Sequence, residues 1–195
     1  MSQSADHRRW TGAEYLAWEA SQRTRHELID GQVFAMAGAK NRHELLKKDL
    51  LTALDARLRG KGPCEPFGSD TKVAVPNGNY RYPDVVVDCT ENRDLDSLFA
   101  ETPRVLFEIL SPTNTWTERA ARIQDFQSIP ACAIVAVVWS TAARIEVLVR
   151  EPGGAWPQTA EIADGRAAAA VLAALGIELP LEEVYRGFAD TDLPD

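Results

Sequence analysis

The chain has few of the residues that build the commonest catalytic and metal centres. Three cysteines, Cys64, Cys89 and Cys132, are scattered through 195 residues without a CxxC pair. This pattern argues against a disulfide framework and a structural zinc site, and it suits a reducing cytoplasm. We expect Cys89 and Cys132 to be small buried hydrophobes. The three histidines, at positions 7, 26 and 43, give little support to a hydrolase triad.

Several motifs and segments are also missing. No glycine-rich phosphate loop of the GxxxxGKS/T or GxGxxG type occurs, which disfavours nucleotide-dependent enzymes. The chain has no GxSxG elbow and no HExxH zinc motif. No apolar run approaches the ~18 residues of a membrane span, and residues 1–7 lack the apolar core of a signal peptide. We therefore expect no membrane segment and no nucleotide cofactor.

Positive charge is scarce overall but concentrated locally. Twenty-nine acidic against 21 basic residues give a net charge of −8, whereas proteins that bind DNA generally rely on a basic surface. The stretch 40–48 is more basic than the rest, and we favour a solvated helix face over a phosphate-binding surface for it. Its candidate nucleic-acid contacts are Lys40, Arg42, His43 and Lys47. For His43 we favour capping or packing over catalysis; Lys72 reads as an exposed strand residue that could touch phosphate.

The hydrophobic patterns predict one α/β domain over residues 1–195, with 1–10 as a flexible amino-terminal segment. A capping box at Thr11 and Glu14 should open a helix to about residue 19, and Asn41 should cap a helix to about 58. Thr115 or Thr117 should cap another to about 127, and the alanine-rich stretch 166–175 resembles a closing helix.

Strands should form a mixed, mainly antiparallel central sheet flanked by these helices. Alternating or continuous apolar runs predict strands over 26–30, 32–37, 71–75, 80–89, 104–110, 131–139, 144–150 and 156–162. The expected core comprises Leu45, Leu50, Leu54, Val85, Val87, Leu106, Ile109, Val135, Val137, Ile145 and Val147.

The main functional signal is a pair of carboxylates in apolar strand sequence. Asp84 stands in YPDVVV (82–87) and Glu108 in FEILSPT (107–113). Burying an unpaired carboxylate costs several kcal/mol, and two in neighbouring strands repel each other unless a cation or a shared proton intervenes. A divalent metal with oxygen ligands is the economical answer, which points to phosphodiester chemistry.

These two motifs, together with HELIDG (26–31), His43 at the start of a helix and LPLEEVY (179–185), resemble the Uma-type restriction endonuclease family of the PD-(D/E)xK nuclease superfamily. The resemblance runs from about residue 11 to 187. It implies that Mg²⁺ or Mn²⁺ is held by Asp84, Glu108 and the backbone carbonyl of Ile109.

The resemblance also implies a third acid, Glu27, and a catalytic lysine on the helix after Glu108, where this chain has Arg122. Arginine stays protonated, so Arg122 preserves electrostatic stabilisation but puts proton transfer in doubt. Arg119 lies three residues earlier on the same helix face and could share this role or contact nucleic acid.

Structural roles for the acids remain open. Asp84 could accept backbone hydrogen bonds at a strand entry, Glu108 could form a buried salt bridge to Arg122 or Arg119, and Glu27 could pair with Arg23 or Arg25. The sequence thus predicts a metal-dependent DNA endonuclease, with a catalytically weakened module that binds nucleic acid or a protein partner as the alternative. Cutting both strands favours a homodimer, for which the apolar hairpin 131–149 offers an interface edge.

Overall fold

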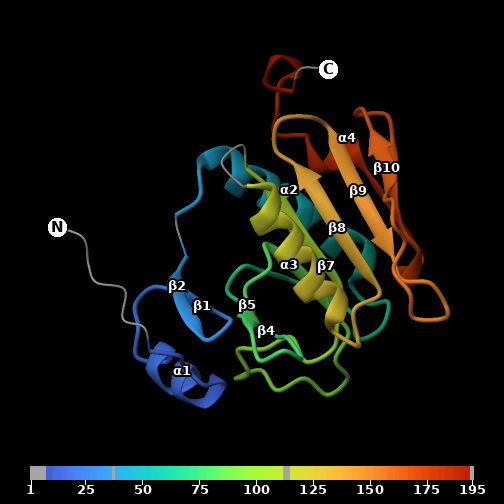
Figure 1. Cartoon of the computed structure of the whole chain (residues 1–195). Helices are drawn as coiled ribbons and strands as arrows, with labels where there is room; N and C mark the ends of the chain where they lie inside the picture. The colour runs from blue at the N-terminus through green and yellow to red at the C-terminus, as the bar shows by residue number, and fades with distance from the viewer. Residues whose placement is uncertain (1–7, 37, 112–114, 194–195) are drawn as a thin grey trace.

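A six-stranded mixed sheet forms the centre of the structure, a computed structural model that describes residues 8–36, 38–111 and 115–193 (Figure 1). Strands β7 and β8 are parallel, and the other neighbouring pairs are antiparallel. The order across the sheet is β10 (Glu161–Asp164), β9 (Arg144–Val149), β8 (Ile134–Trp139), β7 (Pro103–Leu110), β6 (Val85–Asp88) and β3 (Glu65–Gly68). This confirms the predicted mixed, mainly antiparallel sheet.

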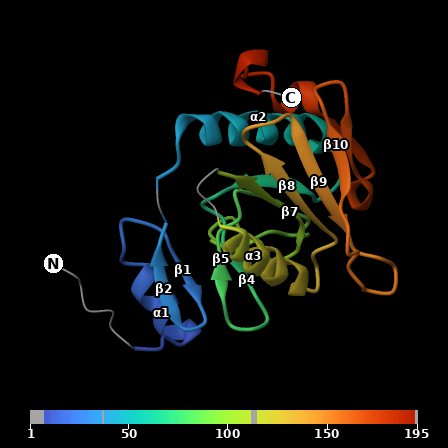
Figure 2. The same ribbon diagram turned by 45° about the horizontal axis from the view of Figure 1, so that its top comes forward.

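Helices α2 (Asn41–Leu58) and α3 (Trp116–Ser128) cover opposite faces of this sheet (Figures 1 and 2). Because successive strand residues point to opposite faces, Val85 belongs to the apolar cluster that includes Leu50 of α2, whereas Val86 belongs to the cluster that includes Phe126 of α3. The sheet is therefore buried on both sides.

The α2 side is completed by the carboxyl-terminal part of the chain. A ribbon of β11 (Ala169–Leu172) and β12 (Ile177–Pro180), with the short helix α4 (Leu181–Val184), adds its apolar residues to the α2 cluster. Two 3₁₀ turns, η1 (Ala173–Leu175) and η2 (Asp190–Asp192), complete the described elements.

A second, four-stranded sheet lies beside the first and carries the amino-terminal helix α1 (Gly12–Glu19) (Figure 2). Its order is β2 (Gln32–Ala35), β1 (His26–Ile29), β5 (Tyr80–Arg81) and β4 (Val73–Ala74). The chain leaves this sheet after Arg81 and enters β6 of the central sheet at Val85. The expected single strand over 80–89 is therefore wrong, because residues 82–84 link two sheets.

Two of the three predicted helix starts are confirmed. The capping box of Thr11 with Glu14 forms as predicted, and of the two candidates Thr115 and Thr117 it is Thr115 that caps α3, in a capping box with Glu118. The cap at Asn41 is wrong: Lys40 occupies the N-cap position without a side-chain hydrogen bond, and Asn41 is the first helical residue. Of the expected core residues, Leu45 is only partly buried.

The predicted helix over 166–175 is also wrong, because this stretch forms β11 and η1. Ala170 and Leu172 are buried while Val171 between them is 45% exposed, so burial follows the two-residue period of a strand. Pairing with β12 thus overrides the helix propensity of alanine. The edge strand expected over 156–162 lies slightly later, at β10.

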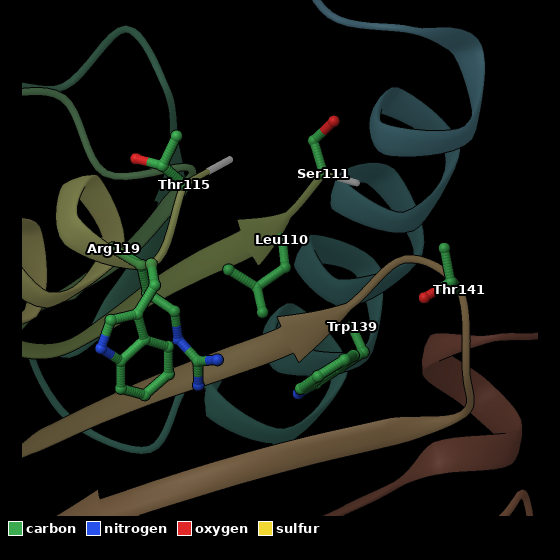
Figure 3. A pocket seen from close by; sticks show the side chains of 7 residues that line it. Leu110, Ser111, Thr115, Arg119, Trp139 and Thr141 are labelled. Atoms are coloured by element: carbon green, nitrogen blue, oxygen red, sulfur yellow. The ribbon is translucent and has the colours of Figure 1, made fainter. Parts of the chain in front are cut away.

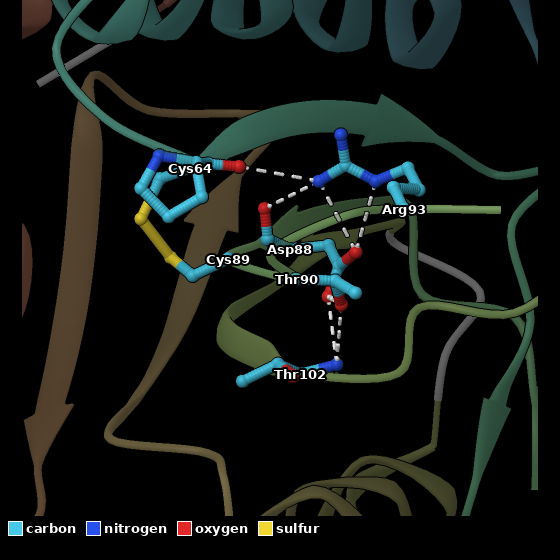
Figure 4. Close-up of a disulfide and its surroundings, with 7 residues drawn as sticks. Cys64, Asp88, Cys89, Thr90, Arg93 and Thr102 are labelled. Carbon is cyan, nitrogen blue, oxygen red and sulfur yellow. Dashed lines mark hydrogen bonds and ion pairs between the residues drawn. A yellow bond between two sulfur atoms is a disulfide. The ribbon is translucent and has the colours of Figure 1, made fainter. Parts of the chain in front are cut away.

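The cysteine prediction needs correction as well. Cys64 and Cys89 form a disulfide just beyond the pairing of Glu65 with Asp88 (Figure 4), and Cys132 is the free cysteine, buried as expected. Pairing of β3 with β6 brings the two thiols together across 25 residues of sequence. Residues 1–7 of the expected flexible segment 1–10 lie outside the described residues, as do residues 112 and 113 of the FEILSPT motif.

Reducing this disulfide should lower the free energy of unfolding by about 2–4 kcal/mol, because the cross-link removes loop-closure entropy from the unfolded chain. Urea unfolding with and without dithiothreitol measures the change. The double variant Cys64→Ser, Cys89→Ser should have the same free energy of unfolding as the reduced protein, and dithiothreitol should not change it. Three free thiols, rather than Cys132 alone, in the denatured non-reduced protein would contradict the pairing.

Candidate active site

Asp84 lies at the entrance of β6, next to the end of β7 that carries Glu108. In the β6–β7 ladder Val85 faces Phe107, which places Asp84 at the level of Glu108. One oxygen of Asp84, Oδ2, accepts a 2.7 Å hydrogen bond from the backbone nitrogen of Ile109. The alternative role of Asp84, accepting a backbone hydrogen bond at the strand entry, is therefore present, and the same bond fixes its carboxylate beside Glu108.

His43, from the first turn of α2, approaches Asp84 from the other side. Its Nε2 lies 3.1 Å from Oδ1 of Asp84. Burial lowers the pKa of His43, but the hydrogen bond and the charge of Asp84 outweigh burial and raise it above its usual value. The sequence predicts His43 as a candidate nucleic-acid contact, and the structure places it against the carboxylate of Asp84.

Glu108 is a buried acid with one of its two carboxylate oxygens unpaired within the described part of the chain. Its Oε1 lies 3.1 Å from Nε of Arg122, whereas its Oε2 is buried and has no hydrogen-bond partner among the described residues. Burial raises the pKa of Glu108 to about 8, and Asp84 and Glu27 add to the rise while Arg122 opposes it. The expected salt bridge to Arg122 is present, and it leaves one carboxylate oxygen unsatisfied.

Arg122, on α3, bridges Glu27 of β1 and Glu108 of β7. Its NH1 and NH2 lie 3.0 Å from the two oxygens of Glu27, and NH1 also donates to the carbonyl of Tyr82 at 3.2 Å. Although burial lowers the pKa of Arg122, the charges of Glu108 and Glu27 raise it above its usual value, so the guanidinium stays protonated. Arg122 is therefore a fixed positive charge beside Glu108.

Glu27 of β1 is saturated with donors. Besides Arg122 it accepts hydrogen bonds from the backbone nitrogen of Tyr82 at 2.9 Å and from NH1 of Arg81 at 3.2 Å. The alternative pairing of Glu27 with Arg23 or Arg25 is wrong. Glu27 is 5% exposed, and its carboxylate is taken up by the buried donors just named. Glu27 thus positions two guanidinium groups.

Sequence reasoning missed Arg81 and Asp125. Nε of Arg81 donates to Oδ2 of Asp125 at 2.7 Å, and Asn77 and Asn79 also donate to Asp125. These residues line part of a polar cavity of about 530 Å³ between β5 and α3. The available signal was the position of Arg81 directly before the YPDVVV motif.

Most of the expected nucleic-acid contacts are paired with other groups of the chain. Lys40 is exposed, but NH1 of Arg42 donates to the carbonyls of Ser140 and Asp192. Lys47 pairs with Glu44 at 2.7 Å. The side chains of Arg42 and Lys47 therefore already have partners within the chain. Among the four candidates of the stretch 40–48, Lys40 is the exposed charge.

Lys72 and Arg119 are corrected. Lys72 is 1% exposed, and its Nζ lies 2.6 Å from Glu19, the last residue of α1, so it cannot touch phosphate. Arg119 pairs with Glu146 of β9 and does not share Glu27 and Glu108 with Arg122. The predicted sharing of the catalytic role is therefore not what the geometry shows.

A divalent metal fits the acids that the structure brings together. The described residues contain no group of three or more His, Cys, Asp or Glu side chains arranged to hold a metal ion. Mg²⁺, however, commonly takes one or two carboxylates and completes its shell with water and substrate phosphate. The buried, unpartnered Oε2 of Glu108, next to Asp84, supplies the hard oxygen that such an ion prefers.

Sequence comparisons relate the chain to one protein family and to two uncharacterized proteins. Residues 13–182 match the model of the Uma2 family, described as "Putative restriction endonuclease". The chain is 31% identical over 189 residues to the uncharacterized protein slr1290 of Synechocystis sp., covering 96% of this chain and 97% of that one. It is 28% identical over 123 residues to the uncharacterized protein sll1609 of the same organism, covering 62% and 69%.

A solved structure extends the comparison. The crystal structure of a "putative nuclease belonging to DUF820" from Anabaena variabilis superposes with a TM-score of 0.73, covering 90% of this chain and 97% of that one at 14% identity. At that identity the likeness establishes the shared α/β fold. Among the described residues, no helix is long and apolar enough to cross a membrane.

The pKa of Glu108 predicts a pH-dependent stability in metal-free protein. The folded value of about 8 exceeds the ordinary value of 4.5, so between these pH values the folded state binds more protons than the unfolded state. Stability from this group is complete below pH 4.5 and is lost as pH rises to 8. Urea midpoints in EDTA should fall across this window, and Glu108→Gln should flatten the fall.

The exposed Glu182 provides a matched control, since Glu182→Gln should leave the slope unchanged. Parallel stability profiles for the parent and Glu108→Gln would show that Glu108 ionises normally in the folded protein.

Proposed function

The chain belongs to the Uma2 family, and on that premise we propose that it is a metal-dependent endonuclease that hydrolyses DNA phosphodiester bonds. The observation that carries the proposal is the buried, unpartnered Oε2 of Glu108, adjacent to Asp84 and to the cationic Arg122. A charged carboxylate oxygen in this environment is costly unless a cation completes it. That cation and a fixed guanidinium are what a phosphoryl-transfer site needs.

Asp84, Glu108 and the carbonyl of Ile109 would hold the ion, Mg²⁺ or Mn²⁺. When bound, such an ion lowers the pKa of a coordinated water and offsets negative charge on the phosphate. The protein prepares the ligands in advance: the amide of Ile109 and the ring of His43 hold the two oxygens of Asp84. His43 is in this respect a positioning residue.

Arg122 would stabilise the charge that develops on the phosphate. Its guanidinium is fixed by Glu27 on one side and lies 3.1 Å from Glu108 on the other. Because the pKa of Arg122 is raised further above its ordinary value, it does not accept a proton from the attacking water. Glu27 therefore contributes to catalysis through the orientation of Arg122.

Two observations favour the alternative of a catalytically weakened module that binds nucleic acid or a protein partner. Arg122 is engaged by two carboxylates and a carbonyl, so a phosphate must compete with internal partners for it. The net charge of −8 also disfavours strong attraction to duplex DNA. Both features lower the expected rate of cleavage.

The proposed partners are DNA and a second copy of the chain, because cutting both strands takes two active sites. The hairpin 131–149 is not an edge, since its strands β8 and β9 lie in the interior of the sheet. We propose β10 as the interface edge instead, because it is an outer strand and its Ile162 is 54% exposed. Light scattering that gives the monomer mass at micromolar concentration would remove the dimer. A cytoplasmic location is retained as part of the proposal, although a stable Cys64–Cys89 disulfide is unusual there.

Purified protein should nick supercoiled plasmid in the presence of Mn²⁺ or Mg²⁺, and Asp84→Ala should abolish nicking because a metal ligand is lost. Agarose electrophoresis follows the conversion to open-circular and linear forms. The parent with EDTA is the second control. Equal cleavage by the parent and by Asp84→Ala would identify a contaminating nuclease and remove the enzyme proposal.

Arg122→Ala should lower the cleavage rate by about 10²-fold, in line with removing one preorganised charge from the transition state. Arg122→Lys should retain or raise the rate, because lysine restores both a cation and a transferable proton. Single-turnover kinetics measures both, and calorimetry should show little change in Mn²⁺ affinity. The exposed Arg104 offers a matched control, Arg104→Ala.

Full activity of Arg122→Ala combined with an inactive Arg119→Ala would show that the other arginine of α3 serves the reaction.

A further inference from the structure

A cavity of about 280 Å³ opens beside the acids, at the carboxyl ends of β7 and β8 and the amino end of α3 (Figure 3). Its walls differ from those of the acidic site, since they are mainly aromatic and apolar. Its lining includes Leu110, Trp116, Arg119 and Trp139. None of them takes part in the proposed hydrolysis.

The cavity exposes a large aromatic surface. Trp116 in the first turn of α3 is 75% exposed, whereas tryptophan is strongly buried in most proteins. The guanidinium of Arg119 lies 5.4 Å from the centre of the Trp116 ring and 5.8 Å from that of Trp139. An accessible indole next to a stacked guanidinium offers flat faces to a flat ligand.

The charges around the cavity are already balanced, which disfavours a phosphate as its ligand. Arg119 and Arg144 both pair with Glu146, and Arg144 also lies 3.6 Å from Asp164, so two carboxylates face the two guanidinium groups. The indole nitrogen of Trp139 donates to Glu146 at 3.1 Å. The arginine is therefore held as a stacking surface and is not a free cation. An uncharged planar group suits such a site better than an anion does.

The cavity lies directly beside the acids. Leu110 follows Glu108 by two residues on β7, so both side chains point to the α3 face, ~7 Å apart along the strand. On α3, Arg119 precedes Arg122 by three residues, and both lie on the same side of the helix. A DNA strand with one phosphate at the acids could thus place a neighbouring base in the cavity.

We propose that this cavity binds an unpaired nucleobase of the DNA strand, stacked on Trp116, next to the phosphate at the acidic site. The proposal deepens the nuclease function and rests on it. Stacking on aromatic side chains is the usual source of affinity for single strands and does not need a strongly basic surface. It therefore reconciles a chain of net charge −8 with a nucleic-acid substrate.

The experiment measures binding in EDTA, where no cleavage occurs. Fluorescence anisotropy compares a fluorescein-labelled oligothymidylate with an abasic oligomer of the same length and charge, for the parent and Trp116→Ala. We expect the parent to bind the oligothymidylate about tenfold more tightly than the abasic strand, and Trp116→Ala to bind the two alike. Phe34→Ala, which removes another exposed aromatic ring on β2, should behave as the parent.

Further arms identify the ligand. Trp116→Phe should keep most of the preference, because a ring remains for stacking, and a blunt duplex should bind more weakly than the single strand. Free thymidine monophosphate should compete poorly; competition as strong as that of the oligothymidylate would overturn the assignment to a DNA strand. Equal binding of both oligomers by the parent, or no binding of either, would overturn the proposal.

Failure here and failure of the nuclease proposal are distinguishable. Cleavage that persists with unchanged binding in Trp116→Ala would remove the base pocket alone. Base-dependent binding without any metal-dependent cleavage would remove the nuclease and leave a nucleic-acid-binding module.

Discussion

A buried ion-pair network centred on Glu27 and Arg122 links the three parts of the molecule that form the candidate site. Glu27 belongs to the small sheet, Arg122 to α3 and Glu108 to the central sheet, and Arg122 lies within 3.1 Å of both acids. Such a network costs desolvation, and its worth lies more in geometry than in stability. Removing one member would leave an uncompensated buried charge and loosen the placement of the other two.

The elements that sequence could predict are those whose signals are local. Capping boxes at Thr11 and Thr115, and the continuous apolar runs of β7 and β8, identified helices and strands because each depends on residues close in the chain. The ribbon at 169–180 was missed because its strand character comes from pairing with a partner strand, while its alanines favour helix in isolation. The Cys64–Cys89 pair likewise depends on the β3–β6 register, which no local pattern reveals.

The candidate site follows the same division. Asp84 and Glu108 could be found because a carboxylate in an apolar strand is conspicuous, and the structure places both at one end of the β6–β7 ladder. The burial of Lys72 could not be foreseen, because its partner Glu19 lies 53 residues away in sequence. Arg81 was missed for the same reason: its carboxylate partners, on β1 and α3, are distant in the chain.

The balance of buried charge gives a physical reason for a divalent ion at this site. Within the described part of the chain, four carboxylates converge here, from Glu27, Asp84, Glu108 and Asp125, and two guanidinium groups, from Arg81 and Arg122, compensate them. Two negative charges remain. Burial is the main cause of the raised pKa of Glu108, and the charges of Asp84 and Glu27 add to it. The pKa of His43 is raised, against the effect of burial, by its hydrogen bond to Asp84 and the charge of that carboxylate.

Protonation of both groups would neutralise the site, but only where the pH allows it. A single divalent cation would achieve the same balance at any pH above the ordinary range of the carboxylates, and it would satisfy the oxygen of Glu108 that has no partner in the described part of the chain. Arg122, in the place of the expected lysine, is consistent with this charge balance. Because its side chain stays positively charged, the excess of negative charge at the site stays at two. The same residue that weakens the case for proton transfer therefore strengthens the case for a metal.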